Sequence, residues 1–143
     1  MLDLNTIQTK IIEYIDSNYE RYLSKYGIKK PQITTDFIDL DKYKNNFTLF
    51  IDFNKINFNK TKFTDDCSRS MQFQISIYLV FRNNTSEKLK EIMLDGASAF
   101  YSLMNNTDFT QEVTITELNN YNIVEGSKFI VISEFTMNIG IEI

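Results

Sequence analysis

The chain has 143 residues, of which 43% are hydrophobic and 14% aromatic, and its formal net charge is −4. This length and apolar content suit one domain over residues 1–143 with its own core, and the single cysteine excludes an internal disulfide. The acidic balance disfavours binding to nucleic acid, the apolar stretches are too short to cross a membrane, and the start lacks the pattern of a secretory signal.

The first expected element is a helix over residues 4–26. Apolar side chains recur there every three or four residues, which is the period of one helical face: Leu4, Ile7, Ile11, Ile15, Tyr19, Tyr22 and Tyr26. Asp3 or Asn5 can cap its start, and Gly27 suits the left-handed residue that ends a helix. We expect the aromatic side chains of this helix to cover a core.

Two strands are expected next. Residues 32–40 alternate weakly, whereas residues 47–53 alternate clearly, with Phe47, Leu49, Ile51 and Phe53 on one side. The polar sequence DLDKYKNN between them is typical of a turn, so we expect the two strands to be antiparallel.

Residues 54–70 are rich in polar side chains, with few apolar residues among them. The pattern fits either a long extension of the preceding strand or a mobile loop, and it contains no helical period. We expect contact with a partner to order it, through four residues: Phe58, Lys60, Lys62 and Phe63.

The clearest strand pattern covers residues 71–82. Its core face carries Phe73, Ile75, Ile77, Leu79 and Phe81. A second helix should follow a cap at Thr85 or Ser86, with an apolar stripe of Leu89, Ile92, Met93, Ala97, Phe100, Leu103 and Met104. Small residues at Gly96, Ala97 and Ala99 favour close packing of this helix on a sheet. A short strand over residues 112–118 and a long one over residues 129–143 complete the chain.

The expected order is therefore α-β-β-β-α-β-β. Helices with one apolar stripe each pack on a single face of a sheet, so we predict an α+β two-layer sandwich. Its sheet should be antiparallel or mixed, with about five strands.

The sequence offers little for catalysis. It contains no histidine, which removes the commonest general base and metal ligand, and its four glycines are too dispersed for a phosphate-binding loop. The best acidic cluster, Asp36, Asp39 and Asp41, lacks the glycine and the closing glutamate of a calcium loop. We expect no catalytic residue, metal or cofactor, although a metal-dependent enzyme that uses these three aspartates stays open as an alternative.

Two apolar strand faces are candidates for contact between subunits. Tyr78 and Val80 lie on the side of their strand opposite the core, where they are either solvated or covered by another subunit. The last strand carries more alternating apolar residues than a lone edge strand usually does: Phe135, Met137, Ile139 and Ile141.

The order of elements resembles that of the tail terminator and head-tail joining (neck) proteins of long-tailed phages and phage-derived particles. The resemblance covers nearly the whole chain and is carried by IIEYIDSNYERYLSKYGI, QFQISIYLVFRNNTSEKLKEIMLDGASAFYSLM and KFIVISEFTMNIGIEI. It implies a structural virion protein of the tail or neck, made in the cytoplasm of the bacterial host. It further implies a ring, usually of six subunits, that caps the tail tube protein and contacts the connector or neck protein of the head. The family has no catalytic residues.

A host-encoded protein-binding module of the immunity or regulatory type is the alternative function. Such a module would be a monomer or a dimer with a single partner site. Oligomeric state therefore separates the two hypotheses.

Overall fold

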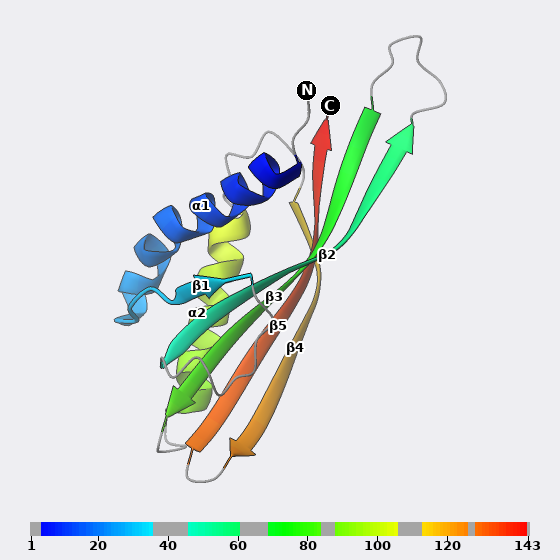
Figure 1. The fold of residues 1–143 in the computed structure, drawn as a ribbon. Helices are drawn as coiled ribbons and strands as arrows, with labels where there is room; N and C mark the ends of the chain where they lie inside the picture. The colour runs from blue at the N-terminus through cyan, green and yellow to red at the C-terminus, as the bar shows by residue number, and fades with distance from the viewer. Residues whose placement is uncertain are drawn as a thin grey trace.

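The computed structural model describes residues 4–35, 46–60, 69–83, 88–105, 113–125 and 128–142. Two helices lie on one face of a five-stranded sheet (Figure 1). The elements in chain order are α1 (Leu4–Leu23), the 3-10 helix η1 (Ser24–Tyr26), β1 (Gln32–Thr34), β2 (Phe47–Lys60), β3 (Arg69–Asn83), α2 (Leu89–Asn105), β4 (Val113–Glu125) and β5 (Lys128–Glu142). The predicted α+β class and element order are confirmed.

The sheet has the strand order β1-β2-β3-β5-β4 and is mixed. Antiparallel pairs join β2 to β3, β3 to β5 and β5 to β4, whereas β1 runs parallel to β2, with Gln32 opposite Thr48. The prediction that the first two strands are antiparallel is therefore wrong. Residues 35–46 separate them, which is enough for a crossover connection, since this needs about a dozen residues. Polar composition alone does not distinguish a crossover from a turn.

The helical segment formed by α1 and η1 ends at Gly27, as predicted. This residue adopts the left-handed conformation at φ 71°, and its N–H donates to the Ser24 carbonyl at 3.1 Å. The Ile28 N–H donates to the Leu23 carbonyl at 3.2 Å. These bonds satisfy carbonyls that a helix end otherwise leaves free, and they direct the chain towards β1.

The main core lies between the helices and the sheet, and Tyr19 is at its centre. The Tyr19 ring meets Phe47 and Phe100 edge-on, at centroid distances of 6.0 and 5.6 Å. Its hydroxyl donates a 2.7 Å hydrogen bond to the Gly96 carbonyl, which ties α1 to α2. The five predicted core residues of β3 and the predicted stripe of α2 line this core, with Ile92 only partly buried.

Helix α2 approaches the sheet closely at Gly96. A Cβ atom at this position would lie 2.5 Å from Cζ of Phe81, well inside van der Waals contact. The predicted close packing of the small-residue stretch on the sheet is confirmed at this point.

Strand β4 runs from Val113 to Glu125 and is much longer than the predicted strand over residues 112–118. It pairs with β5 along this whole length, with a register shift between Ile115 and Glu117. Polar residues such as Asn120 interrupt the apolar alternation but are compatible with an edge strand, and Asn120 accepts a 2.9 Å hydrogen bond from the Ser133 hydroxyl.

Candidate protein-interaction surface

Three of the predicted interface residues on β5 belong to the core. Phe135, Met137 and Ile139 are at most 1% exposed and lie beneath the helices. The strand order places β5 between β3 and β4, so it is not an edge strand, and its alternation marks the helix-facing side. The prediction that these three side chains form a subunit surface is therefore wrong. The side chain of Ile141 lies outside the described residues.

Tyr78 and Val80 lie on the sheet face opposite the helices, the open face, as predicted. Val80 is nevertheless 2% exposed, because Phe50, Ile130 and their neighbours pack around it in a small second cluster. Val80 is thus unavailable to a partner. Tyr78 is half-buried at the rim of the cluster.

The predicted assembly-ordered loop is partly strand. Phe58 and Lys60 belong to β2, where their backbones pair with Met71 and Arg69 of β3. Lys62 and Phe63 lie outside the described residues, as do the three aspartates of the acidic cluster over residues 36–41.

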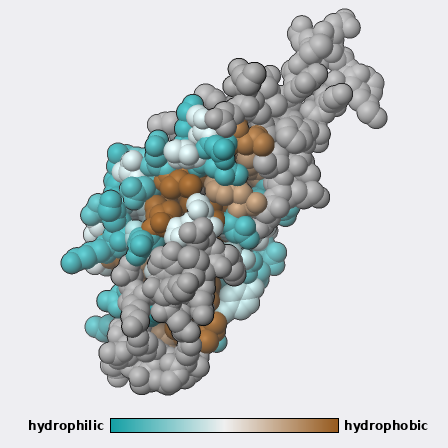
Figure 2. All heavy atoms as spheres, in the orientation of Figure 1, coloured by the Kyte–Doolittle hydropathy of each residue, from teal (hydrophilic) through white to brown (hydrophobic). Residues whose placement is uncertain are grey.

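The exposed large apolar side chains gather along β4 instead. In the view of Figure 2 most of the described surface is hydrophilic, and hydrophobic residues reach it only in small patches. Five of the large exposed ones flank or belong to β4 and are 40–52% exposed; we refer to them together as the β4 margin: Leu94, Tyr101, Leu118, Tyr121 and Ile123. The sequence analysis missed Tyr121 and Ile123 because it ended this strand at residue 118. Leu94, Tyr101 and Leu118 lie in predicted elements, but local spacing does not show that these elements are neighbours.

The helix-facing part of the β4 margin is a groove. Helix α2 packs over β3 and β5, so the neighbouring part of β4 is left beside the helix. Leu94 and Tyr101 of α2 form one wall, Ile115 and Leu118 of β4 form the other, and Phe135 contributes to the floor. Exposed apolar walls of this kind are typical of a protein-binding groove, because a partner that docks there removes apolar surface from water.

The outer edge of β4 is a second feature of the margin. In the described part of the chain no strand pairs with that edge, which runs for 13 residues. Natural proteins usually protect such an edge with proline, charged side chains, a β-bulge or a short length. Strand β4 is long and contains neither proline nor lysine, and it is interrupted only by the register shift next to Glu117. A strand edge of this length is a template for contact with another chain.

On the open face, acidic side chains surround two tyrosines. The Tyr121 hydroxyl donates to Oε2 of Glu134 at 2.8 Å, and the Tyr78 hydroxyl reaches Oε1 of the same carboxylate at 3.4 Å. The hydrogen bond to Glu134 raises the pKa of Tyr121, and the negative charge of Glu117 raises it further. Burial raises the pKa of Tyr78, and the negative charges of Glu134 and Asp52 add to this effect. We name Asp52, Glu117 and Glu134 the acidic patch.

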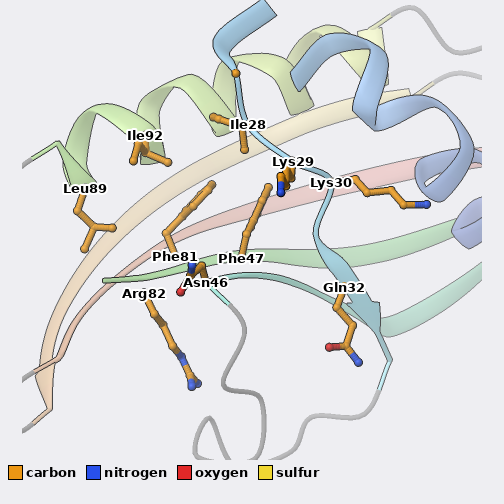
Figure 3. A pocket seen from close by; sticks show the side chains of 11 residues that line it. Ile28, Lys29, Lys30, Gln32, Asn46, Phe47, Phe81, Arg82, Leu89 and Ile92 are labelled. Carbon is orange, nitrogen blue, oxygen red and sulfur yellow. The ribbon is translucent and has the colours of Figure 1, made fainter. Parts of the chain in front are cut away.

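A separate cavity lies between the start of α2 and the segment that joins η1 to β1 (Figure 3). Its lining is mixed: the stacked rings of Phe47 and Phe81 lie among apolar side chains, and polar residues that include Lys29, Lys30 and Asn46 complete it. The side chains of Arg82 and Gln32 point away from the two rings in Figure 3. No polar pair suited to acid–base chemistry converges there among the residues that line the cavity.

The described residues also contain no group of three side chains arranged to hold a metal ion. Neither α1 nor α2, the two α-helices of the described chain, is long and apolar enough to span a bilayer. In comparisons with known proteins, no family model matches the sequence, and no curated protein is similar enough to serve as a relative. The β4 margin is therefore the feature from which a function can be argued.

Proposed function

We propose that the chain is a structural subunit of a phage-type tail, which forms a ring that ends the tail tube and joins it to the head connector. The β4 margin is the single observation that carries this proposal. It combines a long strand edge, with which no described strand pairs, and an apolar groove beside that edge, and both features suit permanent contact with protein. The resemblance of the element order to tail terminator and neck proteins supplies the kind of assembly.

A ring requires a head-to-tail interface, in which two different patches of each subunit meet. The sheet provides the necessary polarity, because β1 and β4 form its opposite edges. A neighbour that docks on the β4 margin with its β1 side leaves its own β4 margin for the next subunit. When the rotation between neighbours closes, such contacts form a ring of fixed size, which would stop tube growth at one end and present its other end to the connector.

Loss of the gene in a strain that produces the particle tests this function. We expect tails of irregular length, or complete heads and tails that fail to join, when particles are examined by electron microscopy. A plasmid copy of the gene should restore joined particles of uniform tail length. Normal infectious particles from the deletion strain would refute the function. A purified protein that remains monomeric or dimeric, even with the tube protein present, would favour the immunity or regulatory alternative.

A further inference from the structure

The end of α1 and the turn that follows it form an exposed basic corner. Residues 21–30, RYLSKYGIKK, contain four basic side chains and no acidic one, although the whole chain has a net charge of −4. All four basic side chains are exposed, and we name them together the basic corner: Arg21, Lys25, Lys29 and Lys30. Positive charge is thus concentrated at one place on an acidic protein.

Contacts within the subunit neutralise little of this charge. Lys30 pairs with Asp16 at 3.6 Å, and more than half of each side chain remains exposed. Glu20 is exposed directly before the corner. The Lys25 ammonium lies 5.6 Å from the centre of the Tyr26 ring, and this ring is itself 37% exposed. Tyrosine and arginine are residue types that protein interfaces favour, and both are exposed in this corner, at Tyr26 and Arg21.

The acidic patch has the opposite character and lies elsewhere on the subunit. Cross-strand pairing places Asp52 and Glu117 at the two ends of one row over the sheet, and Glu134 in the adjacent row. Among the basic residues of the described strands, Lys55 of β2 lies in the row next to Asp52, whereas Arg82 lies towards the opposite end of β4, in the row of Ile130 and Ile123. The negative region is therefore centred on the β4 side, at Glu117 and Glu134, with Tyr78 and Tyr121 beside them.

The two charged regions cannot meet within one subunit. The basic corner adjoins β1, whereas the acidic patch extends to β4 at the opposite edge of the sheet and lies on the face that carries no helix (Figure 1). Two copies arranged head-to-tail can bring them together. One copy then still has a free acidic patch and the other a free basic corner, so further copies can be added in the same way.

We propose that the basic corner of one copy of this chain docks on the acidic patch beside the β4 margin of the next. The inference rests on the proposed ring function and adds the two surfaces that meet and the direction in which subunits follow one another. Charge complementarity selects a second copy as the occupant, because the chain carries both halves of the contact. The apolar groove contributes buried area, while the charges fix the register.

Charge reversal with restoration tests the contact. Glu117→Lys and Lys29→Glu alter exposed side chains, so both variants should fold, which circular dichroism would verify. We expect each single reversal to weaken self-association at least about tenfold in sedimentation velocity, and the double variant to recover most of the loss. High salt should weaken wild-type association and have less effect on the single variants. Glu13→Lys, an exposed acid on α1 outside both regions, serves as the matched control.

The outcomes separate this inference from the ring function. If the wild-type protein forms a ring that neither reversal weakens, the docking assignment fails while the ring function stands. If the wild-type protein forms no ring at any concentration, alone or with the tube protein, both fail. If Lys29→Glu abolishes binding to a DNA duplex but leaves self-association unchanged, the basic corner serves nucleic acid and the docking assignment is again overturned.

Discussion

At the scale of single residues, Tyr19 shows how one polar group can join two helices inside an apolar core. Its hydroxyl is buried and bonded to the Gly96 carbonyl, and burial raises the pKa of the phenol well above its ordinary value of 10.0. The raised pKa means that the folded protein favours the neutral phenol. The contribution of this tyrosine to the free energy of unfolding is fully present below pH 10. It is lost as the pH rises from there towards the pKa of Tyr19 in the folded protein, because the unfolded chain ionises first.

Replacement of this hydroxyl should therefore have two effects. Tyr19→Phe should lower the free energy of unfolding at neutral pH by about 1 kcal/mol, because the buried hydrogen bond between the hydroxyl and the Gly96 carbonyl is lost. It should also make the decline of stability above pH 10 less steep. Urea unfolding at pH 7 and at several alkaline values measures both. Tyr26→Phe, at an exposed tyrosine, is the control, and an equally steep alkaline decline in Tyr19→Phe would contradict the assignment.

Residues such as Phe73 and Phe100 could be assigned to the core from the sequence, because their spacing follows one face of an element. Phe135 shares the same kind of pattern but was assigned to a surface. Alternation shows which residues share a face, whereas the strand order decides whether that face is covered. The strand order depends on pairing between segments that are distant in the sequence, so the spacing of residues within one strand does not predict it. Val80 was misjudged for the same reason, since Phe50 and Ile130 reach it from two other strands.

At the scale of elements, Gly96 sets the distance between α2 and the sheet. Alanine usually stabilises a helix by about 1 kcal/mol relative to glycine. Here the added methyl group would meet the Phe81 ring at 2.5 Å, and this ring is stacked on Phe47 with centroids 4.1 Å apart. The ring therefore has little freedom to move away.

The clash should outweigh the gain in helix propensity. We expect Gly96→Ala to lower the free energy of unfolding by about 1–3 kcal/mol, the usual cost of an overpacked core. Ser98→Ala, on the exposed side of the same helix, is the control and should change stability by less than about 0.5 kcal/mol. Chemical denaturation measures both variants. A Gly96→Ala protein more stable than the wild type would show that α2 can shift from the sheet at no cost.

The lengths of β2 and β4 could not be predicted from the sequence. Both strands continue through residues whose polarity resembles that of a loop, as at Asn57 and Asn122. Backbone pairing with a neighbouring strand supports these stretches, so the side chains need not alternate. Part of the candidate surface was lost with them, because Tyr121 and Ile123 lie in the part of β4 that lacked a clear pattern.

At the scale of the whole molecule, the surface near the β1 edge of the sheet differs from the surface near the β4 edge. The β1 side carries the basic corner, whereas the β4 side carries exposed apolar residues, an edge that no described strand pairs with, and Glu117 of the acidic patch. The net charge of −4 does not reveal this difference between the two sides, because it is a sum over positive and negative regions of the surface. A molecule with two different sides is suited to directional assembly, whereas a symmetric dimer would use one patch twice.

The β4 margin should be necessary for that assembly and unimportant for folding. Leu94→Glu combined with Leu118→Glu places two carboxylates on opposite walls of the groove, where a neighbour would have to bury them. Both leucines are 42–51% exposed in the subunit, so the free energy of unfolding should stay within about 1 kcal/mol of the wild-type value. Sedimentation velocity should show a monomer under conditions in which the wild-type protein forms a ring. Leu4→Glu, at a leucine of similar exposure on α1, should assemble normally. A ring that persists in the double variant would show that subunits meet through another surface.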